Sequence, residues 1–387
     1  MKLQEVSKHG KLQLRWTLDD LWTVEEPIGS PEIFGYRTKC EFSIGKNLND
    51  EPTVGFLLGM YRDGVTSVIE PGDTIHIPEK AKAIAAIMQA YVRESRYPVY
   101  DRKTRKGVWR TIMVKVQNTG DVLLLIQISA DDLDSHQLER EKQALINYWS
   151  VHGITTMMLQ KWNGESHGVN IRGTTEILTG DGYVYEQLLE HQFRISSSAF
   201  FQVNTKATEL LYAKCAEWCN LRDNGRKTTL LDLCCGCGSI GISIGKAADR
   251  VVGIEMNSDA IDDALFNVQL NMVTNAQYFA SKVEEKIDIV ANEQNEDVIA
   301  VLDPPRSGVH SSVIKAVRES SQIQKLIFIS CDANQAMQNF VALCRPTSNK
   351  FQGIPFKPRR AVIVDLFPHT DHYELMVEFV RVNEQSE

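Results

Sequence analysis

The sequence predicts two domains: a mixed α+β domain over residues 1–195, then an α/β domain over residues 196–387 with an open parallel sheet. The chain of 387 residues is longer than the ~100–200 residues of one typical domain. Strand patterns come in pairs before residue 195, whereas strands and helices alternate after it. Hydrophobic residues make up 43% and charged residues 24%, an ordinary globular composition that excludes wholesale disorder.

The first half contains three strand-like runs and two amphipathic helices. Strands are predicted over residues 39–44, 111–116 and 122–128. Helices are predicted over residues 80–94 and 138–149, where apolar residues recur on one face. This mixture is typical of an α+β domain.

The second half follows a more regular order. Apolar strands are predicted over residues 230–233, 251–255, 298–302 and 325–330, with a closing strand over 375–380. Helices are predicted over residues 240–248 and 258–272, the second capped by Asn257 or Ser258. In open parallel sheets ligands bind beyond the carboxyl ends of the strands, and the distinctive polar motifs of this chain fall there.

The N-terminus and the cysteines bear on the cell compartment. Basic residues in the first fifteen positions faintly suggest a mitochondrial presequence, but Leu12, Leu14 and Trp16 alternate like a strand. Neither a secretory signal nor an apolar run of the ~18 residues needed for a membrane span is evident. The eight cysteines are too sparse for a disulfide scaffold. We expect a cytoplasmic or nuclear protein, with mitochondrial import less favoured.

The overall charge disfavours a nucleic-acid partner, but its distribution does not. With 42 Lys and Arg against 50 Asp and Glu, the net charge is -8, whereas phosphate binding depends on basic surface. Two local clusters are basic: the run from Arg102 to Arg110, which includes Trp109, and the group Lys357, Arg359 and Arg360. A basic run beside an aromatic residue suits single-stranded RNA. We therefore expect a basic cleft on an otherwise acidic protein.

A glycine-rich turn follows the first strand of the second half. Gly236, Gly238 and Gly241 have the G-x-G-x-x-G spacing that lets a backbone approach a nucleotide-like ligand. Glu255 ends the next strand, 23 residues after Asp232, where an acid can accept hydrogen bonds from ribose hydroxyls. Dehydrogenases and S-adenosylmethionine (AdoMet) enzymes share these features, so the turn alone leaves both open. Because Cys234 and Cys237 have no second Cys or His pair at zinc spacing, no metal site is expected.

Three further motifs lie at strand ends. Asp303 is followed by two prolines and Arg306, so its carboxylate is held rigidly and could bind a planar base. Cys331 ends a strand ahead of a helix, a position that can depress a thiol pKa and yield a nucleophile. Glu374 stands beside aromatic residues, where partial burial would raise its pKa and make it a proton acceptor. A dehydrogenase would leave these three residues without joint roles.

Together these motifs resemble the tRNA (uracil-5-)-methyltransferase family, specifically its eukaryotic homolog A branch. The resemblance rests on Tyr36–Phe42, on Phe200–Asn204, on the strand-end motifs and on Asp365–Glu374. It implies a Rossmann-like class I AdoMet-dependent methyltransferase domain preceded by an α+β RNA-binding domain. It also implies AdoMet as the methyl donor, with no metal or iron–sulfur cluster.

The resemblance implies roles for individual residues. Cys331 would attack C6 of uracil and Glu374 would remove the C5 proton. Asp303, Phe200 and Arg306 would bind the substrate. The residues implied to bind AdoMet are Gln202, Asp232, Cys234, Gly236, Gly238, Glu255 and Asp303.

The implied function is methylation of uridine C5 in RNA, giving 5-methyluridine, at U54 of the tRNA T-loop. The same chemistry on rRNA or another RNA is an alternative, as is a tRNA-binding or folding protein with weak or lost catalysis. The last is favoured only by Asp332 and Ala333, where the family commonly has Asn-Pro; the extra carboxylate would raise the thiol pKa. The sequence lacks the iron–sulfur motif and RNA-recognition domain of some relatives, so we expect the first half and the cleft to bind tRNA. No membrane and no obligate protein partner are expected.

Overall fold

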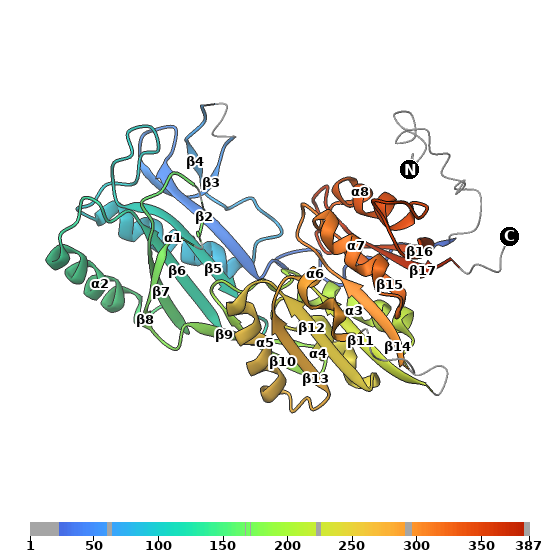
Figure 1. Ribbon diagram of the computed structural model, residues 1–387. Coiled ribbons are helices and arrows are strands. Elements are labelled where there is room, and N and C mark those ends of the chain that lie inside the picture. Colours follow the sequence, from blue (N-terminus) through green and yellow to red (C-terminus); the bar gives the residue numbers. More distant parts are fainter. Residues whose placement is uncertain are drawn as a thin grey trace. The chain divides into compact units, whose positions relative to one another are not determined.

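The computed structural model describes residues 23–59, 64–166, 168–170, 172–221, 226–290 and 296–382, which form two compact units (Figure 1). The N-terminal unit comprises residues 32–188 and 192–205; the C-terminal unit comprises residues 189–191 and 206–387 together with the segment before residue 32. The expected boundary at residue 195 falls within the stretch where the chain passes between the units. The strand expected around Leu12 to Trp16 lies outside the described residues. In the described part of the chain, no helix is long and apolar enough to cross a membrane.

The N-terminal unit is built on a seven-stranded sheet. The strands predicted in this half are confirmed, and all neighbours are antiparallel except β6 and β7. A separate hairpin follows, formed by β9 (Tyr183–Leu188) and β10 (His191–Ser196). In spatial order the sheet strands are β4 (Val68–Ile69), β3 (Pro52–Leu57), β2 (Lys39–Lys46), β5 (Trp109–Val116), β6 (Val122–Ile128), β7 (Thr156–Lys161) and β8 (Thr174–Thr179).

Both predicted helices of this unit pack on one face of the sheet. They are α1 (Glu79–Glu94) and α2 (Ser135–Trp149), which begins at a capping box formed by Asp134 and Gln137. Residues from both helices share one buried core with β2, β5, β6 and β7. On the opposite face, the sheet contacts the segment that contains Ser196 and Ala199. Buried Lys115 donates hydrogen bonds to the carbonyls of Ser196 (2.7 Å) and Ala199 (3.0 Å).

The C-terminal unit contains an eight-stranded sheet in which only β17 runs antiparallel to its neighbours. The open parallel sheet and the five predicted strands are confirmed; β1, β13 and β16 were not predicted. In spatial order the strands are β1 (Thr23–Val24), β16 (Phe356–Val364), β17 (Glu374–Arg381), β15 (Ile323–Ser330), β14 (Glu296–Leu302), β11 (Lys227–Leu233), β12 (Arg250–Glu255) and β13 (Ala276–Ala280).

Helices cover both faces of this sheet. Residues at alternate strand positions, such as Leu231 and Val252, form one core with α6, α7 and α8. On the other face, Gly241 of α4 approaches Val251, and Gly245, just after α4, approaches Val251 and Leu230. The helix predicted over 240–248 stops early, at Ile244, and continues as a 3-10 turn over Gly245–Ala247. The helices of this unit are α3 (Thr205–Cys219), α4 (Ser239–Ile244), α5 (Ser258–Leu270), which is capped by Asn257 as predicted, α6 (Val283–Lys286), α7 (Ser311–Glu319) and α8 (Ala333–Cys344).

Candidate active site

The glycine-rich turn joins β11 to α4 through a run of left-handed backbone. Cys234, Gly236 and Gly238 have φ angles of 60°, 53° and 80°. The backbone N–H groups of Cys234 and Cys235 both donate to the Ile254 carbonyl, at 2.9 and 3.2 Å. The turn is therefore pinned to the end of β12. Cys234 is half-buried, and burial followed by the charge of Glu255 raises the pKa of its thiol to about 12, so it stays neutral.

Tyr278 on β13 packs against this turn. Its hydroxyl donates to the Gly238 carbonyl at 3.3 Å. A Cβ on Gly238 would lie 3.0 Å from the Tyr278 ring, and a Cβ on Gly253 would lie 2.1 Å from it. Glycine is needed at these positions because the ring fills the space a side chain would occupy.

Glu255 and Gly236 form a cradle that fits a ribose-bearing ligand. The two carboxylate oxygens of Glu255 accept hydrogen bonds from the backbone N–H groups of Gly236 (3.3 Å) and Asn257 (2.9 Å), which fixes the carboxylate beside the turn. A Cβ on Gly236 would meet no atom within 4 Å, so this part of the turn faces open space. An acid at the end of the second strand beside an open glycine turn matches the arrangement that binds nucleoside ligands.

Asp232 acts inside this turn rather than at its surface. It is fully buried, and one carboxylate oxygen accepts the Gly241 N–H at 2.8 Å, which ties β11 to α4. Burial raises the Asp232 pKa to about 7; the Gly241 hydrogen bond opposes this rise, and the charges of Asp303 and Glu255 add to it. The residue thus orders the turn whether or not it touches a ligand.

The loop after β14 carries Asp303 and Arg306. Its first residue, Asp303, lies next to the turn, since its N–H donates to the Leu233 carbonyl at 3.4 Å. Its far end is clamped to α8 by Asn339, whose side chain accepts the Val309 N–H (3.1 Å) and donates to the Val309 carbonyl (2.9 Å). The clamp fixes the loop against the helix that begins after Cys331.

Cys331 lies between β15 and α8 and is half-buried. Asp332 is the N-cap of α8, and its carboxylate accepts the N–H groups of Asn334 (3.0 Å) and Gln335 (3.1 Å). The expectation of a depressed thiol pKa is wrong for this structure: burial, followed by the charge of Glu374, raises the Cys331 pKa, and the charge of Arg306 opposes the rise. The Asp332 carboxylate is engaged by the N-terminus of the helix.

Glu374 begins β17 and is 3% exposed. Burial and then the charge of Asp303 raise the pKa of its carboxyl well above the usual range, as predicted, while Arg306 lowers it. Within the described residues, its Oε2 has no hydrogen-bond partner. A buried carboxyl oxygen without a partner is costly, so this atom is available to a ligand.

These residues form one electrostatic cluster at the carboxyl ends of β14 and β15. Arg306 is exposed, yet it lowers the pKa of both Cys331 and Glu374, so it lies near both. Asp303 raises the pKa of the same two groups. A thiol, a buried carboxyl, a second carboxylate and a guanidinium thus act on one another, an arrangement typical of catalytic sites.

Two predicted site residues belong to the N-terminal unit. Gln202 is 5% exposed and Phe200 is 67% exposed. They lie on the segment from Phe200 to Asn204, which is attached to β2 through the Thr38 N–H donating to the Val203 carbonyl at 2.8 Å. Their roles toward a cofactor or substrate remain predictions.

The two basic clusters agree with the sequence interpretation only in part, because Lys103, Arg105 and Lys106 of the first and Lys357 and Arg359 of the second are exposed, whereas other members are not. Trp109 is fully buried, and Arg110 is 5% exposed with its guanidinium 4.0 Å from the Tyr100 ring centroid, so neither forms an RNA-binding surface. Arg360 lies on β16 and pairs with buried Glu378 at 2.7 Å. Arg110 and Arg360 are therefore held by contacts within the fold. No group of three or more possible metal ligands occurs in the described ranges.

Sequence reasoning missed Asn339 and Tyr278. Each supports the site through backbone groups, and a lone Asn in a helix or a lone Tyr in a strand carries no motif that would reveal this.

The fold is that of class I methyltransferases: it has a Rossmann-like sheet, a glycine-rich turn with an acid on the next strand, and ionisable groups at the strand ends. The sequence profile described as tRNA (Uracil-5-)-methyltransferase matches residues 164–382. The chain belongs to the tRNA (uracil-5-)-methyltransferase family.

Individual relatives agree with this assignment. The chain is 37% identical to mouse tRNA (uracil-5-)-methyltransferase homolog A, and the match covers 92% of this chain and 59% of the relative. It is 36% identical to the human homolog A, and that match covers 91% of this chain and 57% of the relative. It therefore spans less than two thirds of these relatives. Human homolog B is 33% identical over 92% of this chain and 72% of its own length.

One solved structure supports the fold. The Pyrococcus abyssi tRNA (uracil-54, C5)-methyltransferase in complex with S-adenosyl-L-homocysteine aligns with a TM-score of 0.69 at 21% identity, over 92% of this chain and 79% of that one.

Proposed function

We propose that this protein transfers a methyl group from AdoMet to C5 of a uridine in RNA, at position 54 of the tRNA T-loop. The observation that carries the proposal is the cluster of Cys331, Glu374, Asp303 and Arg306. Family membership supports this chemistry. The S-adenosyl-L-homocysteine and the uracil-54 target named for the Pyrococcus abyssi enzyme support the donor and the position. AdoMet, when bound, supplies an electrophilic methyl group.

Cys331 would act first. Because C5 of uracil is a poor nucleophile, the Cys331 thiolate adds to C6, and the electron pair of the C5–C6 double bond moves into an enolate. The enolate C5 then takes the methyl group. Arg306 favours the thiolate, since its charge lowers the thiol pKa, and Asp303, whose charge also acts on this thiol, would accept a hydrogen bond from the uracil ring.

Glu374 would act second, as the base that takes the C5 proton. The C6–S bond then breaks and the thiolate leaves, so atoms and charge balance. The negative forms of Cys331 and Glu374 oppose each other. Bonding of the sulfur to C6 removes the thiolate charge, which makes ionisation of Glu374 easier at the step that needs a carboxylate. The raised Glu374 pKa also makes this carboxylate a stronger base.

The binding-only alternative has one supporting feature, the pair Asp332 and Ala333. Asp332 caps α8 and Ala333 is buried in the core, so both residues fit the helix start that presents Cys331. The same chemistry on rRNA stays open to experiment: mapping 5-methyluridine in cells lacking the protein separates the RNA targets.

The test is mass spectrometry of nucleosides from unmodified tRNA after incubation with purified protein and AdoMet. The unsubstituted protein is expected to form 5-methyluridine, and Cys331→Ala is expected to form none. Cys344→Ala, the same change at the other end of α8, is the matched control and should retain activity. RNA containing 5-fluorouracil should trap a covalent complex only when Cys331 is present. Full activity of Cys331→Ala would overturn the proposal.

A further inference from the structure

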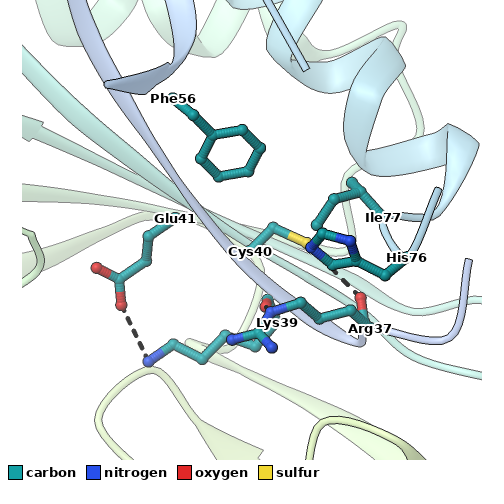
Figure 2. Close-up of a pocket in the computed structure, with 7 residues that line it drawn as sticks. All are labelled: Arg37, Lys39, Cys40, Glu41, Phe56, His76 and Ile77. Carbon is teal, nitrogen blue, oxygen red and sulfur yellow. Dashed lines mark hydrogen bonds and ion pairs between the residues drawn. The ribbon is translucent and has the colours of Figure 1, made fainter. Parts of the chain in front are cut away.

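The N-terminal unit contains a cavity of about 330 Å³ beside β2 that the proposed chemistry does not use. This volume is at the lower end of the ~300–1,000 Å³ typical of small-ligand sites, so it suits one nucleotide-sized group rather than a duplex. Figure 2 shows the residues that line it: Arg37, Lys39, Cys40, Glu41, Phe56, His76 and Ile77.

The cavity combines an apolar floor with an aromatic wall. Cys40 and Ile77 are 3% and 2% exposed, so the floor is part of the core. Phe56 is half-buried, and its ring is backed by buried Phe42, with centroids 5.3 Å apart. In Figure 2 the Phe56 ring lies across the cavity from Arg37. A ring held from behind offers a face on which an unpaired base can stack.

The charge in the cavity comes from Arg37. Lys39 pairs with Glu41 at 3.0 Å, which offsets one cation with one anion. In contrast, no carboxylate of the described residues forms an ion pair with Arg37. Its Nε donates to the Lys39 carbonyl at 3.0 Å, which fixes the guanidinium plane and leaves its terminal nitrogens as donors. A fixed guanidinium fork suits the oxygens of a phosphate.

The cavity strand is also attached to the segment that contains Phe200 and Gln202. Thr38, between Arg37 and Lys39, donates to the Val203 carbonyl through its N–H (2.8 Å) and through its hydroxyl (3.3 Å). Residues 37–39, which flank the cavity, are therefore hydrogen-bonded to the segment from Phe200 to Asn204.

We propose that this cavity binds one unpaired nucleotide of the RNA substrate, with Arg37 on a phosphate and Phe56 stacked on the base. The proposal rests on the proposed function, because that function makes RNA the substrate. It also supplies the RNA contact that buried Trp109 and Arg110 do not provide.

The experiment measures binding of an unmodified tRNA transcript to the full chain carrying Cys331→Ala, by fluorescence anisotropy at several salt concentrations. Adding Arg37→Gln should weaken binding about tenfold and reduce the salt slope by about one, as expected for a lost phosphate contact. Adding Phe56→Leu should weaken binding about tenfold with the slope unchanged, and Phe56→Trp should restore it. In the Cys331 protein, these changes should raise KM for tRNA more than they lower kcat.

Arg140→Gln is the matched control, since Arg140 is exposed on α2 of the same unit and the change removes the same charge. Equal weakening by Arg140→Gln, or unchanged binding with Arg37→Gln and Phe56→Leu, would overturn the site. If Arg37→Gln abolishes binding of adenosine 5′-monophosphate but leaves tRNA binding unchanged, the site would also be overturned, in favour of a free-nucleotide site. These outcomes are distinct from failure of the proposed function, which would appear as no 5-methyluridine from the unsubstituted protein.

Discussion

At the scale of single residues, burial and the charges of two neighbours determine the direction of the Cys331 pKa shift. Burial and Glu374 raise its pKa, and the charge of Arg306 lowers it. A free thiol held mostly neutral is protected from oxidation and alkylation, since the thiolate is the reactive form. The same cation lowers the pKa of Glu374, so Arg306 favours the ionised form of both groups.

We predict that Arg306→Gln shifts the pH profile of Cys331 alkylation to higher pH. The reason is that Arg306 stabilises the thiolate; without it the folded-state thiol pKa rises further, and the reactive fraction at neutral pH falls. The rate of iodoacetamide modification of Cys331, followed by mass spectrometry from pH 7 to 10, measures the shift. Arg359→Gln, at an exposed arginine on β16, serves as the control. An unchanged profile in Arg306→Gln would show that the two groups do not interact.

At the scale of elements, loop and helix ends hold the reactive groups in place. Asn339 joins the loop of residues 303–309 to α8, and Gly308 makes the contact possible. Gly308 has φ +71°, and a Cβ there would lie 2.4 Å from the Asn339 Oδ1. These contacts fix the loop, which carries Arg306, against the helix that begins after Cys331.

Asn339→Ala should lower kcat about tenfold or more and move the Cys331 alkylation profile upward, as in Arg306→Gln. Both hydrogen bonds to Val309 are lost, so the loop loosens and Arg306 no longer favours the thiolate as strongly. The unpaired Val309 groups should also cost about 1–3 kcal/mol of stability, measured by urea unfolding. Gln338→Ala, at the exposed neighbour on α8, should change neither property. Loss of stability with an unmoved alkylation profile would mean that Asn339 is only structural.

The elements show how far the sequence could predict the site. Three strands of the site were predictable because their apolar runs are uninterrupted. They are β14, which precedes Asp303, β15, which precedes Cys331, and β17, which begins at Glu374. The direction of the Cys331 pKa shift was not predictable from the sequence, since it depends on burial and on the carboxylates of Glu374 and Asp303, which lie far away in the chain. Trp109 and Arg110 were assigned to a surface because a basic run suggests solvent, whereas β5 buries both. The two-residue β1 has too few residues to give a pattern.

At the scale of the whole molecule, the segment before residue 32 belongs to the C-terminal unit, where β1 pairs with β16. The segment after β1 adds an edge to the sheet, with Glu25 N–H donating to Ala361 (2.8 Å) and Ile28 N–H donating to Ile363 (2.8 Å). The Glu25 carboxylate also pairs with Lys214 at 3.2 Å. The C-terminal unit is therefore discontinuous in sequence, because it includes residues from before the N-terminal unit.

We predict that a chain lacking residues 1–31 is less stable than a chain lacking residues 1–22, because only the first deletion removes β1 and the strand contacts that follow it. Besides the pairing of β1 with β16, three further backbone hydrogen bonds are lost, including the one from the Asp365 N–H to the Ile28 carbonyl, at a net ~0.5–1.5 kcal/mol each. For a unit of this size the difference corresponds to a melting temperature lower by roughly 5–10 °C. The exposed edge of β16 should also make the shorter chain aggregate. Differential scanning calorimetry and light scattering on the two chains make the comparison; equal melting temperatures would show that the β1 edge adds no stability, and that residues 206–387 fold without it.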